Sequence, residues 1–404
     1  MSKVLKTRSL MGAAALVLAA LPFAATPAQA DGPGAGAPWV VSVGDSYISG
    51  EAGRWAGSSN TSSAASDALG ATAYFDNAAG TAEQINRCHR SRSAQVFIGG
   101  GVNGLNLACS GAKSATVDGT EFKPGLDFYD DGAGRIGQAK ALQQFAASHH
   151  VTMVNVSIGG NDFNFASIVQ SCVVDFLYSP SWLKDYCKDD KSVVANFTAA
   201  NVAAVKARVA TAYANVRTAM RNAGYADSAW TMLVQNYPSP IPGGSGFRYG
   251  QSGYTRQDTG GCGFWNADAD WANATALPTI NATVTGAISQ AGISNAKTLD
   301  LASAYNGRRL CETGVGLYEE VGLTSWTQSG AVDRTEWVNQ IRTVTTAGSS
   351  PYYIQESLHP GYWGQLANRS CVRQAWNGGA PRSGRCVRSG TGLTALGEPR
   401  MALQ

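Results

Sequence analysis

Short apolar runs alternate with longer stretches of helical periodicity along most of the chain. The runs typical of buried β-strands cover residues 39–43, 105–108, 151–158, 229–237 and 297–301. The stretches with helical spacing cover residues 136–147, 195–222 and 267–291. Because strands that alternate with helices form βαβ units, the sequence predicts a parallel sheet and an α/β fold.

Three long segments separate these elements. Residues 165–192, 238–266 and 306–350 are predicted to be insertions at loop ends. Phe247, Tyr249 and Tyr254 make residues 238–259 a candidate rim for an apolar groove, with a passive surface loop as the alternative. Since no repeat and no linker divides the chain, residues 31–404 are predicted to form a single domain.

Residues 1–30 have the features of a secretory signal peptide. Three basic residues precede an apolar stretch over residues 10–25, and an Ala-x-Ala cleavage site ends at Ala30. A membrane anchor is the alternative, but the stretch is short for a span of about 20 residues, and Pro22 and Pro27 interrupt this segment. No later stretch reaches membrane-spanning length, so we expect a secreted, extracellular chain without an integral membrane segment.

Removal of this segment changes the charge balance of the chain. The 404 residues carry 31 basic and 28 acidic side chains, a formal net charge of +3. Residues 1–30 contain three of the basic residues and none of the acidic ones, so the remainder is balanced at 28 of each. Nucleic-acid binding by bulk electrostatics therefore has no support, and no nucleic-acid partner is expected.

The eight cysteines indicate disulfides rather than metal binding. They form no Cys-x-x-Cys motif and no Cys/His cluster with zinc spacing. In an oxidising compartment disulfides are the default. We predict sequential pairing: Cys88–Cys109, Cys172–Cys187, Cys262–Cys311 and Cys371–Cys386.

Four short motifs carry candidate chemistry. Ser46 stands in Gly-Asp-Ser at the end of the first predicted strand, where open α/β sheets place ligands. Gly111 follows the second strand, and Asn161 follows the third in Gly-Gly-Asn-Asp. His359 comes three residues after Glu356, a spacing at which a carboxylate in a turn can reach the imidazole Nδ1 while Nε2 faces a serine.

Each motif alone also has an ordinary structural explanation. Serine is a common helix N-cap, and glycine and asparagine are common in turns. Among the other histidines, His149 and His150 lie at a predicted turn and are expected to be solvated, and His89 is expected to be structural.

Together and in this order, the four motifs resemble those of the SGNH, or GDSL, hydrolase superfamily. The resemblance runs from about Trp39 to Gln365 and leaves the insertions unmatched. It implies a three-layer α/β/α fold with a central, mostly parallel five-stranded sheet. It also implies that Ser46 is the nucleophile, that His359 is its general base, and that Ser46, Gly111 and Asn161 form the oxyanion hole.

The sequence departs from this family at Glu356, where the family usually has aspartate. Glutamate is one methylene longer, so two hypotheses stay open: Glu356 orients His359 as the third catalytic residue, or a backbone carbonyl does so. Asp45 and Asp162 are expected to hold their turns by local hydrogen bonds.

The resemblance to secreted bacterial GDSL lipases and phospholipases of the A/B type implies a lipid or phospholipid ester as substrate, with no cofactor and no metal. A monomer is expected. A carbohydrate acetyl esterase and an inactive secreted binding protein are the alternatives, because one fold hosts many functions. Acyl-chain length and positional preference on glycerol stay open.

Overall fold

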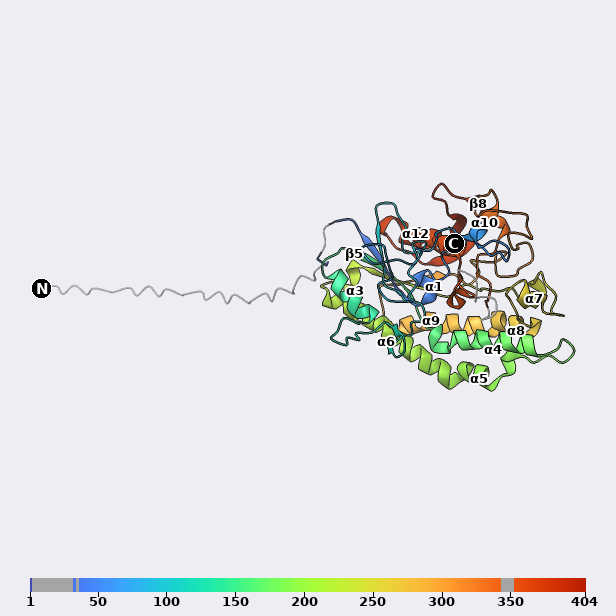
Figure 1. Ribbon diagram of the computed structural model, residues 1–404. Helices are drawn as coiled ribbons and strands as arrows, with labels where there is room; N and C mark the ends of the chain where they lie inside the picture. The colour runs from blue at the N-terminus through green and yellow to red at the C-terminus, as the bar shows by residue number, and fades with distance from the viewer. Residues whose placement is uncertain (2–31, 34–35, 343–351) are drawn as a thin grey trace.

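A seven-stranded, mostly parallel sheet forms the centre of the computed structural model, which describes residues 1, 32–33, 36–342 and 352–404 (Figure 1). The strand order is β2-β1-β5-β6-β7-β8-β9. The first five of these strands pair in parallel. In sheet order they are β2 (Asn103–Asn106), β1 (Trp39–Gly44), β5 (Val151–Ser157), β6 (Thr231–Gln235) and β7 (Ala296–Asp300). The predicted signal peptide, apart from Met1, lies outside the described residues.

Each of these five strands overlaps one of the five predicted apolar runs, β2 only at Leu105 and Asn106, but the expected number of strands is wrong. A C-terminal hairpin of β8 (Gly384–Leu393) and β9 (Pro399–Leu403) extends the sheet beyond β7. Most β8 side chains are exposed, so its sequence carries no apolar run. Its parallel pairing with β7 covers only two residue pairs. The Cys371–Cys386 disulfide joins this strand to helix α12 (Tyr362–Trp376).

Alternating side chains of the strands build two separate cores. Val41, Val43, Val154 and Val156 face a core that includes buried residues of α3 (Gln138–Ala146), α6 (Ala199–Asn222) and α9 (Leu277–Gln290). On the opposite face, Val40, Met153, Leu233 and Leu299 pack with residues of α12. The architecture is therefore three-layered, with α3, α6 and α9 on one side of the sheet and α12 on the other (Figure 1).

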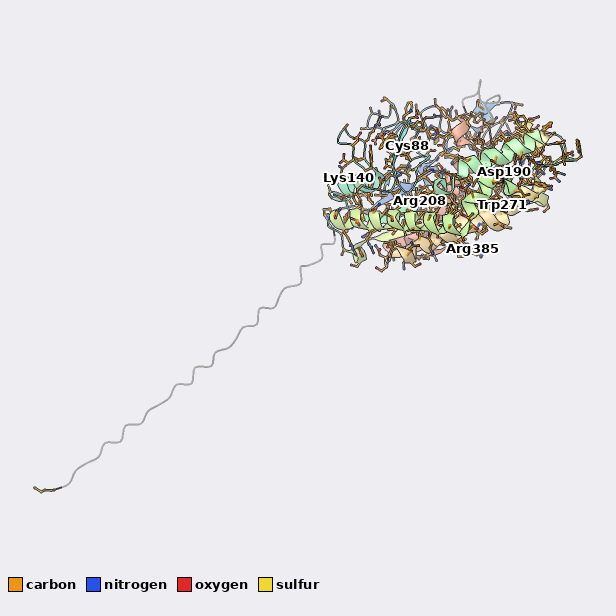
Figure 2. The ribbon with its side chains drawn as sticks, turned by 90° about the horizontal axis from the view of Figure 1, so that it is seen from below. Cys88, Lys140, Asp190, Arg208, Trp271 and Arg385 are labelled. Atoms are coloured by element: carbon orange, nitrogen blue, oxygen red, sulfur yellow. A yellow bond between two sulfur atoms is a disulfide. The ribbon has the colours of Figure 1, made fainter. Side chains whose placement is uncertain are left out.

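Figure 2 shows α6 running along one face of the molecule, with Lys140 towards one end and Asp190 and Trp271 towards the other. The remaining helices of at least four residues among the described ranges are α1 (Ser46–Ser49), α2 (Ser63–Ser66), α4 (Phe165–Tyr178), α5 (Lys191–Val194), α7 (Thr255–Asp258), α8 (Asn266–Trp271) and α10 (Ala331–Arg334). The strands β3 (Val117–Asp118) and β4 (Phe122–Lys123) form a separate small hairpin. No helix in the described ranges is long and apolar enough to cross a bilayer.

The predicted helix over 267–291 is continuous but changes its winding. Helix α8 passes into a π-helix at Ala272–Ala276, which passes directly into α9. Pro278 stands in the first turn of α9, where its missing N–H removes one α-helical hydrogen bond to the preceding turn. The wider turn accommodates this loss, and π-turns of this kind are frequent at functional sites.

Four disulfides pair all eight cysteines in the sequential order predicted from the sequence. Cys88–Cys109 ties the loop after β2 to the loop that precedes it, and Cys172–Cys187 ties α4 to the segment that follows it.

Removing one disulfide tests its contribution to stability. The double substitution Cys371→Ser with Cys386→Ser opens a bridge of sequence separation 15. We expect the free energy of unfolding to fall by about 3 kcal/mol, because the unfolded chain gains loop entropy. Equilibrium urea unfolding followed by tryptophan fluorescence measures this change against the parent chain. A loss below about 1 kcal/mol would contradict the expectation.

Candidate active site

A sharp turn from β1 into α1 presents Ser46. Gly44 ends the strand with φ +141°, and a Cβ there would lie 1.8 Å from the Ser157 carbonyl oxygen, so only glycine fits. Asp45 caps α1 and accepts a hydrogen bond from the Tyr47 amide at 3.1 Å. Ser46 is consequently the first residue of α1, where backbone amides have no partner within the helix.

Hydrogen bonds of the Gln138 side chain fix the backbone of this turn. No sequence motif indicated this role. The side-chain oxygen of Gln138 accepts a hydrogen bond from the Gly44 amide at 2.6 Å. Its amide nitrogen donates to the carbonyl of Gly44 at 2.9 Å and to that of Pro124 at 2.7 Å. Gln138 is buried, so these bonds fix the backbone that carries Ser46.

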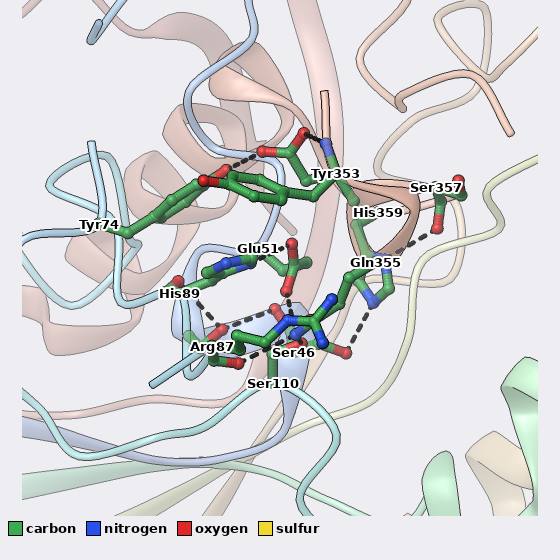
Figure 3. Close-up of polar contacts among 12 residues, drawn as sticks. Ser46, Glu51, Tyr74, Arg87, His89, Ser110, Tyr353, Gln355, Ser357 and His359 are labelled. Atoms are coloured by element: carbon green, nitrogen blue, oxygen red, sulfur yellow. Dashed lines mark hydrogen bonds and ion pairs between the residues drawn. The ribbon is translucent and has the colours of Figure 1, made fainter. Parts of the chain in front are cut away.

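Ser46 and His359, which are 313 positions apart, form a hydrogen-bonded pair (Figure 3). The distance between His359 Nε2 and Ser46 Oγ is 2.7 Å. On the other side of the ring, Nδ1 lies 2.9 Å from the Ser357 carbonyl oxygen. This carbonyl can only accept a hydrogen bond, so it places the proton on Nδ1 and leaves the Nε2 lone pair facing the serine. Burial lowers the pKa of His359, which keeps the imidazole neutral and able to accept a proton.

The structure does not bring the Glu356 carboxylate to His359, and of the two hypotheses for the orientation of the imidazole the geometry supports the backbone carbonyl, that of Ser357. The carboxylate instead accepts hydrogen bonds from the Trp55 indole at 2.8 Å, the Tyr353 amide at 2.9 Å and the Tyr74 hydroxyl. It closes the short 3-10 helix Ile354–Glu356 as a capping box, which turns it away from the imidazole. Burial, reinforced by the charge of Glu51, raises the pKa of Glu356 to about 7.

A second buried carboxylate, Glu51, stands close to the Ser46–His359 pair (Figure 3). Its Oε1 lies 2.7 Å from Nδ1 of His89, and its Oε2 accepts from the Gln355 side chain at 3.1 Å. The same Gln355 nitrogen donates to the Ser110 hydroxyl at 2.7 Å. Burial opposes a charge on His89, but the carboxylates around it, Glu51 above all with Glu83 and Glu356, together raise its pKa.

Glu51 acts on His359 as well as on His89. Burial is the largest influence on the pKa of His359 and lowers it, while the negative charge of Glu51 acts in the opposite direction. The negative charge that favours a protonated His359 therefore comes from Glu51 rather than from Glu356. The sequence places Glu51 five residues after Ser46, but nothing in that spacing pairs it with His89.

The two other motif residues lie on adjoining loops. The Asn161 side chain donates to the Ala112 carbonyl at 2.9 Å and lines the same cavity as Ser46. Gly111, next to Ala112, has φ +82°, a conformation that favours glycine. The Asp162 carboxylate accepts hydrogen bonds from the Ser114 amide at 3.0 Å and from the Ser114 hydroxyl at 2.6 Å. It therefore links the Asn161 loop to the loop that contains Gly111, and does more than hold its own turn.

Tyr237, which follows β6, links the first and third motifs. Its hydroxyl donates to the Asp45 carboxylate at 2.5 Å and accepts from the Gly160 amide at 2.9 Å. Asp45, in addition to its local cap on Tyr47, is thus bound across the sheet edge.

An apolar cavity opens at Ser46 and a second one adjoins it. Ser46, Asn161 and Tyr237 line the first cavity, and Phe165, Pro240, Leu277 and Ile280 line both. The second cavity continues between α4 and the α8–α9 segment, where Ile168, Phe197, Trp271 and Ala276 line it. Of the predicted rim residues, Phe247 is buried in the core and Tyr249 binds Glu320, while Pro238 and Pro240 line the site.

Among the residues that the structure describes, one group of carboxylates has the spacing to hold a cation. Asp175, Asp185 and Asp190 place one ligand atom each within 4.8 Å of the others. They belong to α4 and the segment after it and do not line the cavity at Ser46.

No protein-family model and no curated protein sequence matches the chain. The chain is similar to the crystal structure of an extracellular lipase from Streptomyces rimosus, with 17% identity, coverage of 84% of this chain and 98% of that chain, and a TM-score of 0.43. It is also similar to the crystal structure of phospholipase A1 from Streptomyces albidoflavus NA297, with 18% identity, coverage of 84% and 99%, and a TM-score of 0.44.

The substitution Glu356→Gln tests whether the Glu356 carboxylate has a catalytic or a structural role. Because the carboxylate is bound away from the imidazole, we expect Glu356→Gln to keep kcat/KM for a soluble ester within about fivefold of the parent. His359→Ala is the matched control and is expected to lose activity by at least about 10³-fold. A loss of that size in Glu356→Gln would restore it as a catalytic residue.

The same variant also tests the titration of Glu356. The folded protein raises its pKa from 4.5 to about 7, so folding binds this proton more tightly than the unfolded chain does. Stability therefore falls as the pH rises from about 4.5 to about 7. Measured melting temperatures over this range are expected to fall less steeply in Glu356→Gln, and parallel curves would contradict the shift.

Proposed function

We propose that this protein hydrolyses carboxylic esters of lipids, most specifically acyl esters of glycerophospholipids, with Ser46 as nucleophile and His359 as general base. The observation that carries the proposal is the 2.7 Å contact of these two residues at the mouth of an apolar cavity. A hydroxyl bound to a neutral imidazole is the arrangement that activates serine for acyl transfer.

In the proposed reaction, Ser46 Oγ attacks the ester carbonyl carbon while its proton moves to His359 Nε2. Nδ1–H of His359 donates to the Ser357 carbonyl throughout, and this hydrogen bond stabilises the imidazolium that forms. The oxyanion accepts hydrogen bonds from the amides of Ser46 and Gly111 and from the Asn161 side chain. His359 then protonates the leaving alcohol. Water, activated by the same imidazole, releases the fatty acid and restores Ser46.

The adjoining cavity supports a lipid acyl group over an acetyl group. Its walls are supplied mainly by aromatic and aliphatic side chains from α4 and the α8–α9 segment, including Phe165, Ile168, Trp271 and Ile280. An acetyl group needs none of this space, whereas each methylene of a longer chain gains about 0.8 kcal/mol on leaving water.

Several features of the proposal rest on the sequence alone. Residues 1–30 act as an export signal, residues 31–404 form one catalytic domain, and the mature protein acts outside the cell as a monomer. The four disulfides support an oxidising location. The proposed chemistry needs no cofactor or metal, because Ser46, His359, the backbone donors and the Asn161 side chain supply every proton transfer and charge contact.

Ser46→Ala tests the mechanism directly. We expect release of fatty acid from phosphatidylcholine to fall by at least about 10³-fold, because no other group forms the acyl-enzyme. Comparison of the parent on phosphatidylcholine and on acetyl-xylan, with analysis of the lysophospholipid products, distinguishes a phospholipase from a carbohydrate acetyl esterase. Full activity in Ser46→Ala would exclude the mechanism, and absence of labelling of the parent by a fluorophosphonate would favour a binding protein.

Ala276→Phe tests the acyl cavity. Ala276 is buried and lines the adjoining cavity but not the cavity at Ser46. We expect the added ring to exclude at least two methylenes, which lowers kcat/KM for palmitate relative to butyrate esters by about tenfold. Ala282→Phe, the same change at an exposed position of α9, is the control. An unchanged chain-length preference in Ala276→Phe would place the acyl chain elsewhere.

A further inference from the structure

Four of the exposed large apolar side chains that the structure describes lie within one short segment, residues 174–183. Tyr178 is 85% exposed, Trp182 is 82% exposed and Leu183 is 65% exposed, and Val174 on the preceding helical turn is partly exposed as well. Single exposed apolar residues are normal on a soluble protein, whereas a cluster marks a contact surface. We call residues 174–183 the α4 projection.

The α4 projection is held in place by its own contacts. The Cys172–Cys187 disulfide closes the chain at its base. Ser179 ends α4 by donating its amide to the Asp175 carbonyl at 3.1 Å, and its hydroxyl accepts from the Trp265 indole at 3.2 Å. The Leu183 amide donates to the Pro180 carbonyl at 2.9 Å. The loop that follows α4 extends from the body of the molecule at the right of Figure 1.

The exposed side chains have the chemistry of a water–lipid boundary. Tryptophan and tyrosine combine an apolar ring with a polar group, and they concentrate where membranes meet water. Leucine supplies apolar area that can enter the acyl region. The structure thus presents all three side-chain types on one segment.

The charges around the α4 projection indicate which kind of lipid surface it would bind. Residues 174–191 contain three lysines and four aspartates: Lys184, Lys188, Lys191, Asp175, Asp185, Asp189 and Asp190. This balance gives no net attraction to an anionic membrane, which a cluster of basic residues would provide. A zwitterionic surface such as phosphatidylcholine fits this composition.

The α4 projection is also continuous with the candidate site. It begins in the last turns of α4, and the first eight residues of the same helix line the adjoining cavity through Phe165, Ile168, Val169 and Cys172. With 14 residues, α4 is about 21 Å long. One helix therefore carries part of the cavity wall at its start and Tyr178 at its end, and Trp182 and Leu183 follow in the loop directly after it.

We propose that the α4 projection docks the protein on zwitterionic lipid surfaces by inserting Tyr178, Trp182 and Leu183. This inference rests on the proposed function, since a lipid hydrolase must reach its substrate at such a surface. It adds a binding site that is separate from the residues of catalysis.

The test compares two variants with the parent protein. One combines Tyr178→Ser, Trp182→Ser and Leu183→Ser. The control combines Leu393→Ser and Leu396→Ser, two exposed positions at the β8–β9 turn. Binding is measured by sedimentation with phosphatidylcholine vesicles, with phosphatidylserine vesicles in parallel. Activity is measured on the vesicle lipid and on a soluble butyrate ester.

We expect the triple variant to bind phosphatidylcholine vesicles at least about tenfold more weakly and to hydrolyse vesicle lipid correspondingly slowly. Its activity on the soluble ester, which reports an intact fold and site, is expected to equal that of the parent and the control. The single variant Trp182→Ser, with a smaller change, is expected to give an intermediate loss and serves if the triple variant does not fold.

Equal vesicle binding by the parent, the triple variant and Trp182→Ser would overturn the proposal. Binding of the parent to phosphatidylserine vesicles alone would overturn the zwitterionic assignment. A parent that is a dimer and a triple variant that is a monomer, with equal vesicle binding, would show a contact between copies instead. A parent that binds vesicles through the projection but cleaves neither substrate would leave the docking site standing and refute the proposed function.

Discussion

The hydrogen bond between the Ser357 carbonyl and His359 Nδ1 is the contact on which the candidate site depends. It fixes the tautomer of His359 and so decides that Nε2 can accept the serine proton. A backbone carbonyl can hold this position only if the turn itself is rigid. Leu358, between the two residues, has φ +61°, a conformation that is costly for leucine and persists because its surroundings impose it.

Those surroundings come from distant parts of the chain. The Leu358 carbonyl accepts a hydrogen bond from the Tyr47 hydroxyl at 2.9 Å, and its amide donates to the Asn339 carbonyl at 3.1 Å. Glu356 anchors the same turn to Trp55 and Tyr74. A carboxylate thus still supports the histidine, but by shaping the backbone rather than by touching the ring. The negative charge that favours imidazolium comes from Glu51, while Glu356 holds the backbone of the turn.

The sequence predicted the parts of the structure that depend on local pattern. Each of the five apolar runs overlaps a parallel strand, and the cysteines pair in their chain order. The β8–β9 hairpin was not predicted, because most β8 side chains are exposed and the strand carries no apolar run. The roles of Gln138 and of the Ser357 carbonyl were not predicted from the sequence for another reason. A buried glutamine has no motif, and a carbonyl is present at every residue, so only the fold shows which one is used. The roles assigned to Ser46, Gly111, Asn161 and His359 stay predictions that the geometry supports.

The π-helix at Ala272–Ala276 has a consequence for how the cavity wall is aligned. Each residue of an α-helix rotates the chain by about 100°, so one additional residue in a turn resets the angular position of everything that follows. Leu277 and Ile280 line both cavities while other side chains of α9 pack against α6. Deletion of a single residue from this turn would rotate one set or the other out of alignment. The π-helix therefore sets the rotation of α9 so that one group of its side chains lines the cavities while another group packs against α6.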